Sequence, residues 1–433
     1  MSRQERPATA EREGSMNQSI HANHHSPEPG FALRQTLYRG WAALAKPVYR
    51  TLPIATPCVV SGEGALSQGV AELVKQGIRR PVVITDTAFV DLQVFQQLLQ
   101  ALEAAALEYS VFSEIVPDPD FSIIERGIIH CRNHQFDGVI AIGGGSSIDA
   151  TKVINPCARH NIDPRTVPGM LKLRKRGHYF MAIPTTAGTG SEATAAAVIT
   201  DEHSHQKRVV ISLTVVPELA VLDPSLMMGL PPAITAATGM DALTHAMESY
   251  LSRYATAKTD ALNLESMARI FDHLPRAFHD GANDKEARRQ MAIASHNAGV
   301  TFTRTSVGWV HAIAHQLGAL YGVPHGLANA MVLPHVLAFY LPHAESRMAQ
   351  MARHLGLHGS DDASLALALV EAVHKLCDQL EIRPLLTMVK EEDIPQMARN
   401  IINEAYRSPY PVPGYFGSYA ELEAFIRGMM IPR

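Results

Sequence analysis

Residues 55–225 alternate short runs rich in Val and Ile with longer amphipathic stretches, and this alternation constrains the fold more than any other feature of the chain. Residues 81–86 (PVVITD) and 138–145 (GVIAIGGG, a strand that runs into glycines) are typical of buried strands, and residues 92–108 are typical of an amphipathic helix. Strands that alternate with helices form parallel sheets, because the helices provide right-handed crossovers between them. This part of the chain therefore predicts an α/β domain.

The character of the sequence changes after the proline pair at 231–232. Ala, Leu, Met and His then recur at helical spacing, and strand-like runs almost disappear. Prolines are favoured in the first turn of a helix, so the pair indicates the start of a new element. The polar N-terminus shows no periodicity. We expect a flexible N-terminal extension over residues 1–35, an NAD-binding α/β domain over 36–226 and a helical metal- and substrate-binding domain over 227–433.

Composition excludes several classes of protein. Hydrophobic residues make up 46% of the 433 residues and charged ones 18%, which is enough to build a sizeable core. The formal net charge of −4 gives no support to nucleic acid or an anionic membrane as a partner. No run approaches the ~18 apolar residues of a membrane helix, and the N-terminus lacks the apolar segment of a signal peptide. Four scattered cysteines fit a reducing compartment, so we expect a cytoplasmic protein.

A run of three glycines, Gly143 to Gly145, follows one predicted strand and precedes Ser146 and a helical stretch. Glycines let the backbone approach a diphosphate, and the N–H groups at a helix start attract its charge. Ile148 stands where the G-x-G-x-x-G fingerprint needs its last glycine, so a plain structural turn remains an alternative. A second Gly/Thr-rich segment over 183–194 favours a dinucleotide.

Asp86 ends an earlier predicted strand. A carboxylate there would accept hydrogen bonds from a ribose 2′-OH and repel a 2′-phosphate. Dinucleotide-binding domains normally place this acid after the glycines, whereas here it precedes them. A turn residue is an equally open interpretation.

One carboxylate and several imidazoles recur at one-turn spacing in the helical part. Asp241 and His245 are four residues apart, as are His311 and His315, and His325 follows a Gly-Val-Pro turn. Residues four apart emerge on the same face of a helix. Oxygen and imidazole ligands without thiolate fit Fe(II), Zn(II), Co(II) or Mn(II). Such an ion next to a nucleotide half suggests hydride transfer, with the metal as Lewis acid. His315 would act near the nicotinamide or in a proton relay, or would support the ligands.

Four segments together resemble the iron-containing (group III) alcohol dehydrogenases of the dehydroquinate-synthase-like superfamily: GGGSSIDATK, PTTAGTGSEAT, LPPAITAATGMDALTHAMESY and VHAIAHQLGALYGVPHG. The likeness runs from about residue 52 to the last helix. It implies an α/β N-terminal Rossmann-like dinucleotide-binding domain and an all-helical C-terminal domain, with metal and substrate between them. It also implies a homodimer or larger homo-oligomer.

The resemblance assigns roles residue by residue. It implies four metal ligands, Asp241, His245, His311 and His325, and places His315 near the nicotinamide as the catalytic residue. It implies a pyrophosphate loop of Gly144, Gly145 and Ser146 and further cofactor contacts from Thr185, Thr186, Thr194, Lys207 and Leu226. Asp86 matches the acid associated with NAD rather than NADP. Asp118 stands where the family's Pro-Asn-Pro-Thr stretch has Asn, which changes one expected cofactor contact.

These observations predict a metal- and NAD-dependent alcohol dehydrogenase or aldehyde reductase with NAD and Fe(II), Zn(II) or another divalent metal as cofactors. The small side chains of residues 195–197 (AAA) offer no hydrogen bond to a second hydroxyl, so we expect a simple primary alcohol or aldehyde as substrate. The alternatives are a polyol or hydroxy-acid dehydrogenase and a maleylacetate reductase-like enzyme. A metal-dependent hydrolase would have no use for two nucleotide-type loops, and a non-catalytic scaffold would not need a complete ligand set.

Overall fold

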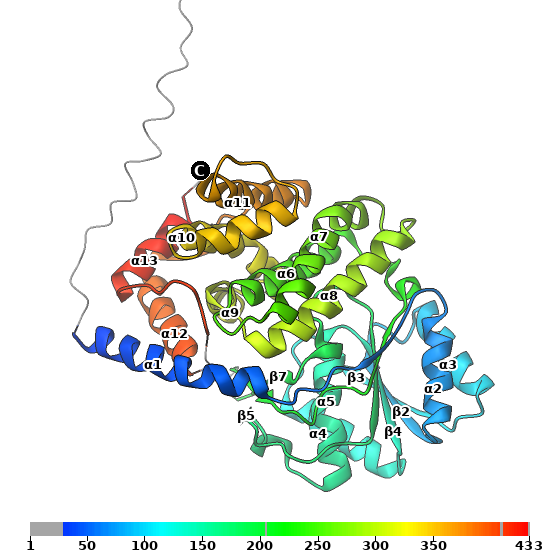
Figure 1. The fold of residues 1–433 in the computed structure, drawn as a ribbon. Coiled ribbons are helices and arrows are strands. Elements are labelled where there is room, and N and C mark those ends of the chain that lie inside the picture. The colour runs from blue at the N-terminus through cyan, green and yellow to red at the C-terminus, as the bar shows by residue number, and fades with distance from the viewer. Residues whose placement is uncertain (1–28, 204–205, 408–409, 432–433) are drawn as a thin grey trace, which may run out of the picture.

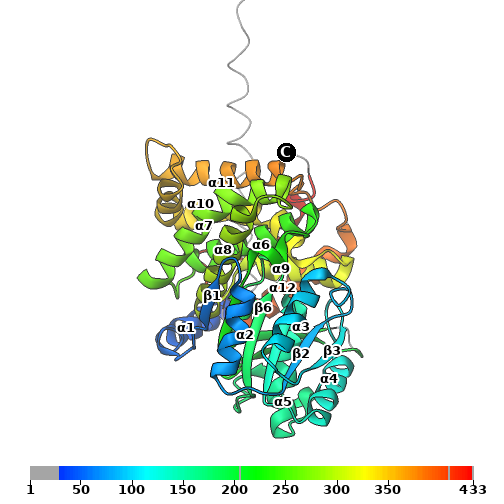
Figure 2. The ribbon, with the colours of Figure 1, turned by 90° about the vertical axis from the view of Figure 1, so that its right-hand side faces the viewer.

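The computed structural model describes residues 29–203, 206–407 and 410–431. A parallel sheet with helices on both faces forms the N-terminal part, and a bundle of helices forms the C-terminal part (Figures 1 and 2). This arrangement confirms the predicted fold class. Within the described residues, no helix is long and apolar enough to cross a membrane.

The main sheet consists of parallel strands in the order β1-β9-β6-β4-β2-β3. Its strands are β1 (Cys58–Ser61), β2 (Pro81–Asp86), β3 (Ser110–Ile115), β4 (Gly138–Gly143), β6 (Tyr179–Pro184) and β9 (Leu219–Leu222). Helices α2 (Ala65–Lys75) and α3 (Gln93–Ala104) cover one face, and α4 (Phe121–Asn133) and α5 (Gly145–His160) cover the other (Figure 1). A smaller sheet contains β5 (Gly169–Met170), β8 (Lys207–Ile211) and β7 (Ala196–Thr200), in that order. Short 3-10 turns are η1 (Pro164–Thr166), η2 (Ser191–Ala193), η3 (Pro224–Met227) and η4 (Glu391–Asp393).

The sequence of β4 shows why this sheet is buried on both faces. Val139 and Ala141 belong to the core under α4 and α5, whereas Ile140 and Ile142 belong to the core under α2 and α3. Successive side chains of a strand point to opposite faces, so a strand covered on both sides reads as a continuous apolar run.

The chain changes direction across the sheet at β2. This strand pairs with β3 on one side, and the next strand along the chain, β4, pairs with its other side. Ligands of open α/β sheets bind at such a switch point, beyond the carboxyl ends of the strands. The residues that end the two strands are Asp86 and Gly143.

The C-terminal part is helical throughout its described residues. Its helices are α6 (Pro232–Leu251), α7 (Ala257–Asp280), α8 (Lys285–Thr305), α9 (Trp309–Tyr321), α10 (His325–His354), α11 (Asp362–Gln379), α12 (Ile394–Arg407) and α13 (Tyr419–Gly428). They share one apolar core, at the centre of which α6 is buried along most of its length. Its residues are therefore held from all sides.

Helix α1 (Pro29–Thr51) packs against this helical part, beside α12 and α13 (Figure 1). Phe31, Tyr38 and Ala42 recur on one helical face and are buried. Tyr38 donates a hydrogen bond to the backbone oxygen of Tyr410 at 2.8 Å. The helix spans the boundary expected at residues 35 and 36: residues 29–35 belong to α1, and 36–51 continue the same helix along the helical part (Figure 1). Residues 1–28 of the expected extension lie outside the described residues.

Candidate active site

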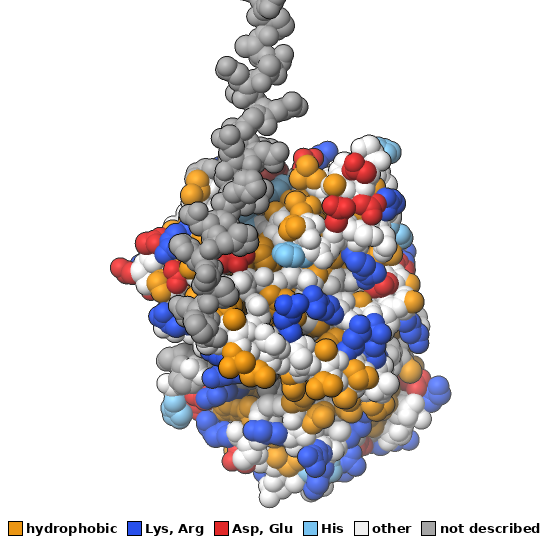
Figure 3. Space-filling view, turned by 60° about the vertical axis from the view of Figure 1, so that its left-hand side comes forward, with side chains coloured by type: hydrophobic (Ala, Val, Ile, Leu, Met, Phe, Trp, Pro, Cys, Tyr) orange, Lys and Arg blue, Asp and Glu red, His pale blue; other side chains and the backbone are white. Residues whose placement is uncertain are grey.

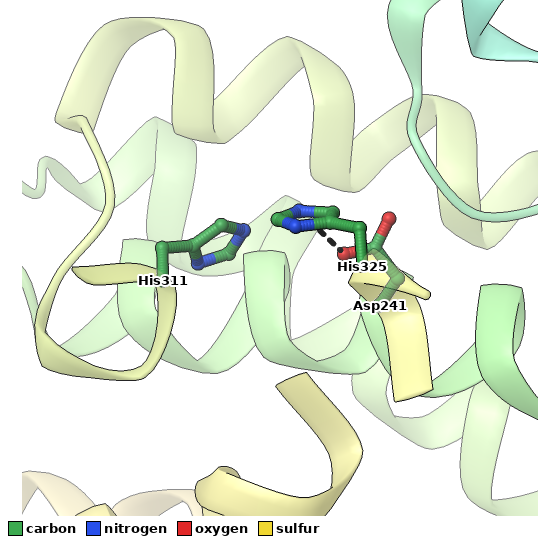
Figure 4. A group of neighbouring side chains, drawn as sticks. All are labelled: Asp241, His311 and His325. Carbon is green, nitrogen blue, oxygen red and sulfur yellow. Dashed lines mark ion pairs between the residues drawn. The ribbon is translucent and has the colours of Figure 1, made fainter. Parts of the chain in front are cut away.

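Asp241, His311 and His325 converge from three different helices (Figure 4). Each offers one ligand atom, and these atoms all lie within 4.8 Å of one another. Asp241 lies in the middle of α6, His311 in the first turn of α9, and His325 is the first residue of α10. Asp241 and His311 are buried, so these two ligand atoms have little access to water.

A glycine allows α10 to begin this close to α6. A Cβ atom at Gly326 would lie 2.3 Å from the backbone oxygen of Ala237 and 3.3 Å from the Cβ of Asp241. Contacts under 3.0 Å to backbone atoms cannot be relieved by a small side-chain movement. The absence of a side chain at this position therefore lets His325 approach Asp241, with 3.6 Å between Nε2 and Oδ1.

The protonation states of the cluster suit metal binding. Burial lowers the pKa of His311 well below its usual value and lowers that of His325 to about 4. Burial raises the pKa of Asp241, but its electrostatic interactions with His245, His325 and His311 and the hydrogen bond from Asn329 outweigh burial and leave that pKa below its usual value. At neutral pH the cluster holds neutral imidazoles and an ionised carboxylate, the forms that bind a cation.

The side-chain nitrogen of Asn329 lies among the three proposed ligands, at a point where their acceptor atoms converge. It lies 2.7 Å from Oδ1 of Asp241, 3.3 Å from Nε2 of His311 and 3.2 Å from Nε2 of His325. An amide carries two N–H groups, so it cannot satisfy three acceptors fully. Three acceptors that share one point fit a divalent cation.

His245, the fourth expected ligand, lies at the margin of this cluster. Its Nε2 is 3.9 Å from Oδ1 of Asp241, and its ring stacks on those of His311 and Phe302. Its Nδ1 is buried and has no hydrogen-bond partner among the described residues. The structure therefore brings all four residues together, with three of them in the tight group.

Sequence reasoning missed Glu248, which holds His311 in place. The Glu248 carboxylate accepts hydrogen bonds from the backbone N–H of Gly308 and Val310, at the start of α9, and contacts Nδ1 of His311 at 2.6 Å. Burial raises the pKa of Glu248 to about 7, although the two N–H donors act in the opposite direction. Asp241, His245 and Glu248 follow the spacing i, i+4, i+7, a signal for a shared helix face.

Glu404 of α12 plays a similar part for His315. It contacts Nδ1 of His315 at 2.6 Å and accepts a hydrogen bond from the hydroxyl of Tyr410 at 2.7 Å. The ring of His315 stacks on that of His325, with centroids 5.3 Å apart. Burial lowers the pKa of His315, but the negative charge of Glu404 outweighs it and raises the pKa above its usual value. His315 thus lies directly beside the cluster.

The glycine loop occupies the switch point of the sheet. Gly143 has φ of 145°, and a Cβ there would lie 2.6 Å from Oγ of Ser147 and 3.2 Å from Oδ2 of Asp86. The loop backbone therefore passes directly beside the Asp86 carboxylate. Gly144 precedes the first turn of α5, and the backbone N–H of Thr185 donates to Gly143 O at 3.0 Å.

Two further expected cofactor residues, Ser146 and Lys207, contact Asp118. Its backbone N–H donates to Oγ of Ser146 at 3.4 Å, and its carboxylate forms an ion pair with Lys207. The negative charge of Asp118 also acts on the pKa of His325, against the effect of burial. The loop after β3 therefore contacts the glycine loop and lies within electrostatic range of His325. Thr186 lies beside the glycine loop, with its Oγ1 3.8 Å from the position that a Cβ of Gly144 would occupy.

Two expected cofactor residues have other contacts. Thr194 is buried and accepts a hydrogen bond from Nζ of Lys152 at 2.7 Å. Leu226 is buried in the core beneath α2 and α3. Ala195 and Ala197 are buried as well, whereas Ala196 is half-buried.

Comparison with known proteins decides the family. The family described as iron-containing alcohol dehydrogenase matches residues 56–224, and the C-terminal domain of the Fe-containing alcohol dehydrogenase family matches residues 235–414. The chain belongs to the iron-containing alcohol dehydrogenases. The family predicted from four sequence segments is thereby confirmed.

The similarity to individual relatives and solved structures covers nearly the whole length of each of those proteins. Lactaldehyde reductase of Escherichia coli (strain K12) is 36% identical over 349 residues, which cover 79% of this chain and 91% of that protein. The crystal structure of a 1,3-propanediol oxidoreductase has a TM-score of 0.83 at 33% identity and covers 87% of this chain and 99% of its own. The sulfoacetaldehyde reductase from Bifidobacterium kashiwanohense, solved in complex with NAD⁺, has a TM-score of 0.79 at 28% identity and covers 87% and 98%.

Proposed function

We propose that this iron-containing alcohol dehydrogenase catalyses reversible hydride transfer between a primary alcohol and NAD. Asp241, His245, His311 and His325 would hold a divalent cation, for which Fe(II) is the leading candidate. The observation that carries the proposal is the convergence of three of these ligands within 4.8 Å. The influence of Asp118 on His325 supports the placement of this cluster next to the dinucleotide loop. Relatives named as aldehyde reductases and alcohol dehydrogenases support the substrate class.

The bound cation would supply Lewis-acid stabilisation of the substrate oxygen, and NAD would supply the hydride acceptor. Two glutamates of the chain orient the histidine rings and fix which ring nitrogen is free to bind the metal or exchange a proton. Glu248 holds the Nδ1 proton of His311, which leaves Nε2 as the ligand atom. Glu404 holds Nδ1 of His315, so Nε2 is the ring atom that can exchange a proton with a substrate hydroxyl.

The remaining cofactor assignments form part of the proposal. Gly144, Gly145 and Ser146 would receive the diphosphate at the start of α5, with Thr185, Thr186 and Lys207 beside it. Asp86 would accept the ribose hydroxyls of NAD. All four cysteines are free thiols, which supports a reducing compartment such as the cytoplasm.

The experiment is metal analysis of protein purified without oxygen, followed by a panel of alcohols and aldehydes assayed with NAD(H). We expect stoichiometric metal and measurable turnover of short primary alcohols. His325→Ala should remove metal and activity together, whereas His354→Ala, an exposed histidine at the end of the same helix, should remove neither. A metal-loaded protein that turns over no alcohol or aldehyde would refute the proposal, and a strong preference for 1,2-propanediol over propanol would exclude its substrate class.

A further inference from the structure

Helix α1 contacts α12 on either side of Glu404 in the sequence. Arg34 of α1 donates a hydrogen bond to Oδ1 of Asn403 at 2.9 Å. The ring of Tyr38 stacks on that of Tyr406, with the centroids 4.7 Å apart. Asn403 comes one residue before Glu404 and Tyr406 two residues after it, so α1 contacts the end of α12 where this carboxylate lies.

Tyr38 also reaches Glu404 through Tyr410. The hydroxyl of Tyr38 donates to the backbone oxygen of Tyr410 at 2.8 Å, and the hydroxyl of Tyr410 donates to Oε1 of Glu404 at 2.7 Å. The same Oε1 lies 2.6 Å from Nδ1 of His315. Both tyrosines are buried, and hydrogen bonds are stronger where water is excluded. A continuous series of contacts therefore runs from α1 to the ring of His315.

Further contacts of α1 fix residues 410–416. This segment forms neither helix nor strand, so its backbone groups need partners from elsewhere in the chain. Nε2 of Gln35 donates to the backbone oxygen of Phe416 at 2.6 Å. The ring of Tyr38 meets that of Tyr415 edge-on, with the centroids 6.1 Å apart. The inner side of α1 thus holds both the end of α12 and the segment beyond it.

Helix α1 lies outside the part of the chain that matches the family, which begins at residue 56. Its outer side is open to solvent. Leu37 and Leu44 are exposed there, and on the side of the molecule where α1 lies, hydrophobic side chains gather in a band across the surface (Figure 3). The buried contacts of α1 therefore come from its inner side, which faces the residues that support Glu404.

We propose that α1 positions His315 for proton exchange, with Tyr38 holding Tyr410 and α12 so that Glu404 keeps its contact with Nδ1 of the histidine. The inference rests on the proposed function, in which Nε2 of His315 exchanges a proton with the substrate hydroxyl. Tyr38 is a positioning residue, because it acts through Tyr410 and Glu404. Supporting residues of this kind hold a reacting group in its productive geometry, and a small displacement slows the step that uses it.

Steady-state kinetics of two matched tyrosine variants test the proposal. Tyr38 and Tyr254 each form one buried hydrogen bond between α1 and the rest of the helical part, because the hydroxyl of Tyr254 donates to the backbone oxygen of Ala42 at 2.9 Å. Tyr38→Phe should lower kcat for a short primary alcohol by about threefold or more, while the KM for NAD and the metal content stay at the level of the parent chain. Tyr254→Phe, and Leu44→Ala on the outer side, should leave all three unchanged. Equal kcat values for Tyr38→Phe and Tyr254→Phe would show that α1 only stabilises the fold.

A double-mutant cycle tests whether Tyr38 acts through Glu404. Tyr38→Leu also removes the stacking on Tyr406, so it should lower kcat further than Tyr38→Phe, by about tenfold. In a Glu404→Gln background the same Tyr38 substitutions should have almost no further effect on kcat, because the contact that they disturb is already lost. Effects that multiply independently in the double variants would overturn the proposal.

Hydrogen exchange of the metal-loaded chain gives a readout that does not depend on turnover. Backbone amides of α12 and of residues 410–416 should exchange faster in Tyr38→Phe than in the parent chain or in Tyr254→Phe, because local opening is easier where a buried contact is lost. Unchanged exchange there would contradict the positioning role. A parent chain that turns over no alcohol or aldehyde would refute the proposed function and this inference with it, whereas an active parent whose kcat is unaffected by Tyr38→Phe would refute this inference alone.

Discussion

Oε2 of Glu248 lies 2.6 Å from Nδ1 of His311, and the same carboxylate receives the first backbone N–H groups of α9. One buried side chain therefore fixes both the start of a helix and the orientation of a ligand on it. Partners of this kind raise the basicity of a ligand histidine and hold its ring in place.

Glu248→Gln should weaken metal binding by about ten- to a hundredfold, because an amide cannot accept all three of these donors. A metal-affinity titration against a coloured chelator measures this change. Glu345→Gln, an exposed carboxylate on α10, is the matched control and should bind metal like the parent chain. Equal affinities for both variants would show that Glu248 only caps the helix.

Gly326→Ala should lower metal content, because the new methyl group would lie 2.3 Å from Ala237 O and push the start of α10 away from Asp241. Gly318→Ala on α9 is the comparison, since its Cβ would meet its nearest neighbour at 3.6 Å. Elemental analysis of the two purified variants measures their metal content. Loss of metal in Gly326→Ala but not in Gly318→Ala would indicate a local displacement of His325. A metal-replete Gly326→Ala variant would disprove the close-approach argument.

Glu404→Gln should reduce kcat by about tenfold or more while metal content stays at the level of the parent chain, because Glu404 contacts His315 and none of the proposed ligands. Tyr410→Phe removes one hydrogen bond to Glu404 and should have a smaller effect in the same direction. Steady-state kinetics with parallel metal analysis measure both. A Glu404→Gln variant that loses metal instead would place His315 among the ligands.

Asp86→Gly should relax discrimination against NADP by at least about tenfold, which corresponds to ~1.4 kcal/mol. The reason is electrostatic: the carboxylate lies beside Gly143 at the switch point and would repel a 2′-phosphate there. The ratio of kcat/KM for NAD and NADP measures the effect. An unaltered ratio would leave Asp86 as a turn residue, whose Oδ1 accepts the Phe89 N–H at 2.9 Å.

One thiol per chain should react with a thiol reagent under native conditions, and four should react in denaturant. Cys58 is exposed, whereas burial raises the pKa of Cys131, Cys157 and Cys377 to about 12. The thiolate is the reactive form, so the three buried groups stay inert at neutral pH. Cys58→Ser should abolish the native signal, and a residual fast-reacting thiol would contradict the burial.

The sequence predicts local structure well where the pattern of apolar or functional residues follows the periodicity of a strand or a helix. The strand predicted over 81–86 is β2, and the strand predicted over 138–145 is β4, which ends two residues earlier at Gly143, because both are continuous apolar runs that end in turn residues. The pairs Asp241/His245 and His311/His315 were recognisable because one helical turn brings side chains together without any tertiary information.

Contacts between distant segments could not be predicted in this way. Glu404 lies 89 residues after His315, and no spacing rule connects them. The buried face of α1 was not predicted from the sequence, and its partner, the segment around Tyr410, could be identified only from the fold. Thr194 carries a hydroxyl in a Gly/Thr-rich loop, yet the buried Lys152 uses that hydroxyl.

The attachment of α1 to the segment around residues 403–419 joins the beginning of the described chain to nearly its end. During translation the ribosome releases this helix well before residues 403–419, so its apolar faces stay uncovered while the intervening residues are synthesised. Contacts so distant in sequence form slowly and expose a nascent chain to aggregation. Folding of this enzyme therefore includes a contact between segments 372 residues apart, made to the backbone of Tyr410, whose hydroxyl also donates to Glu404.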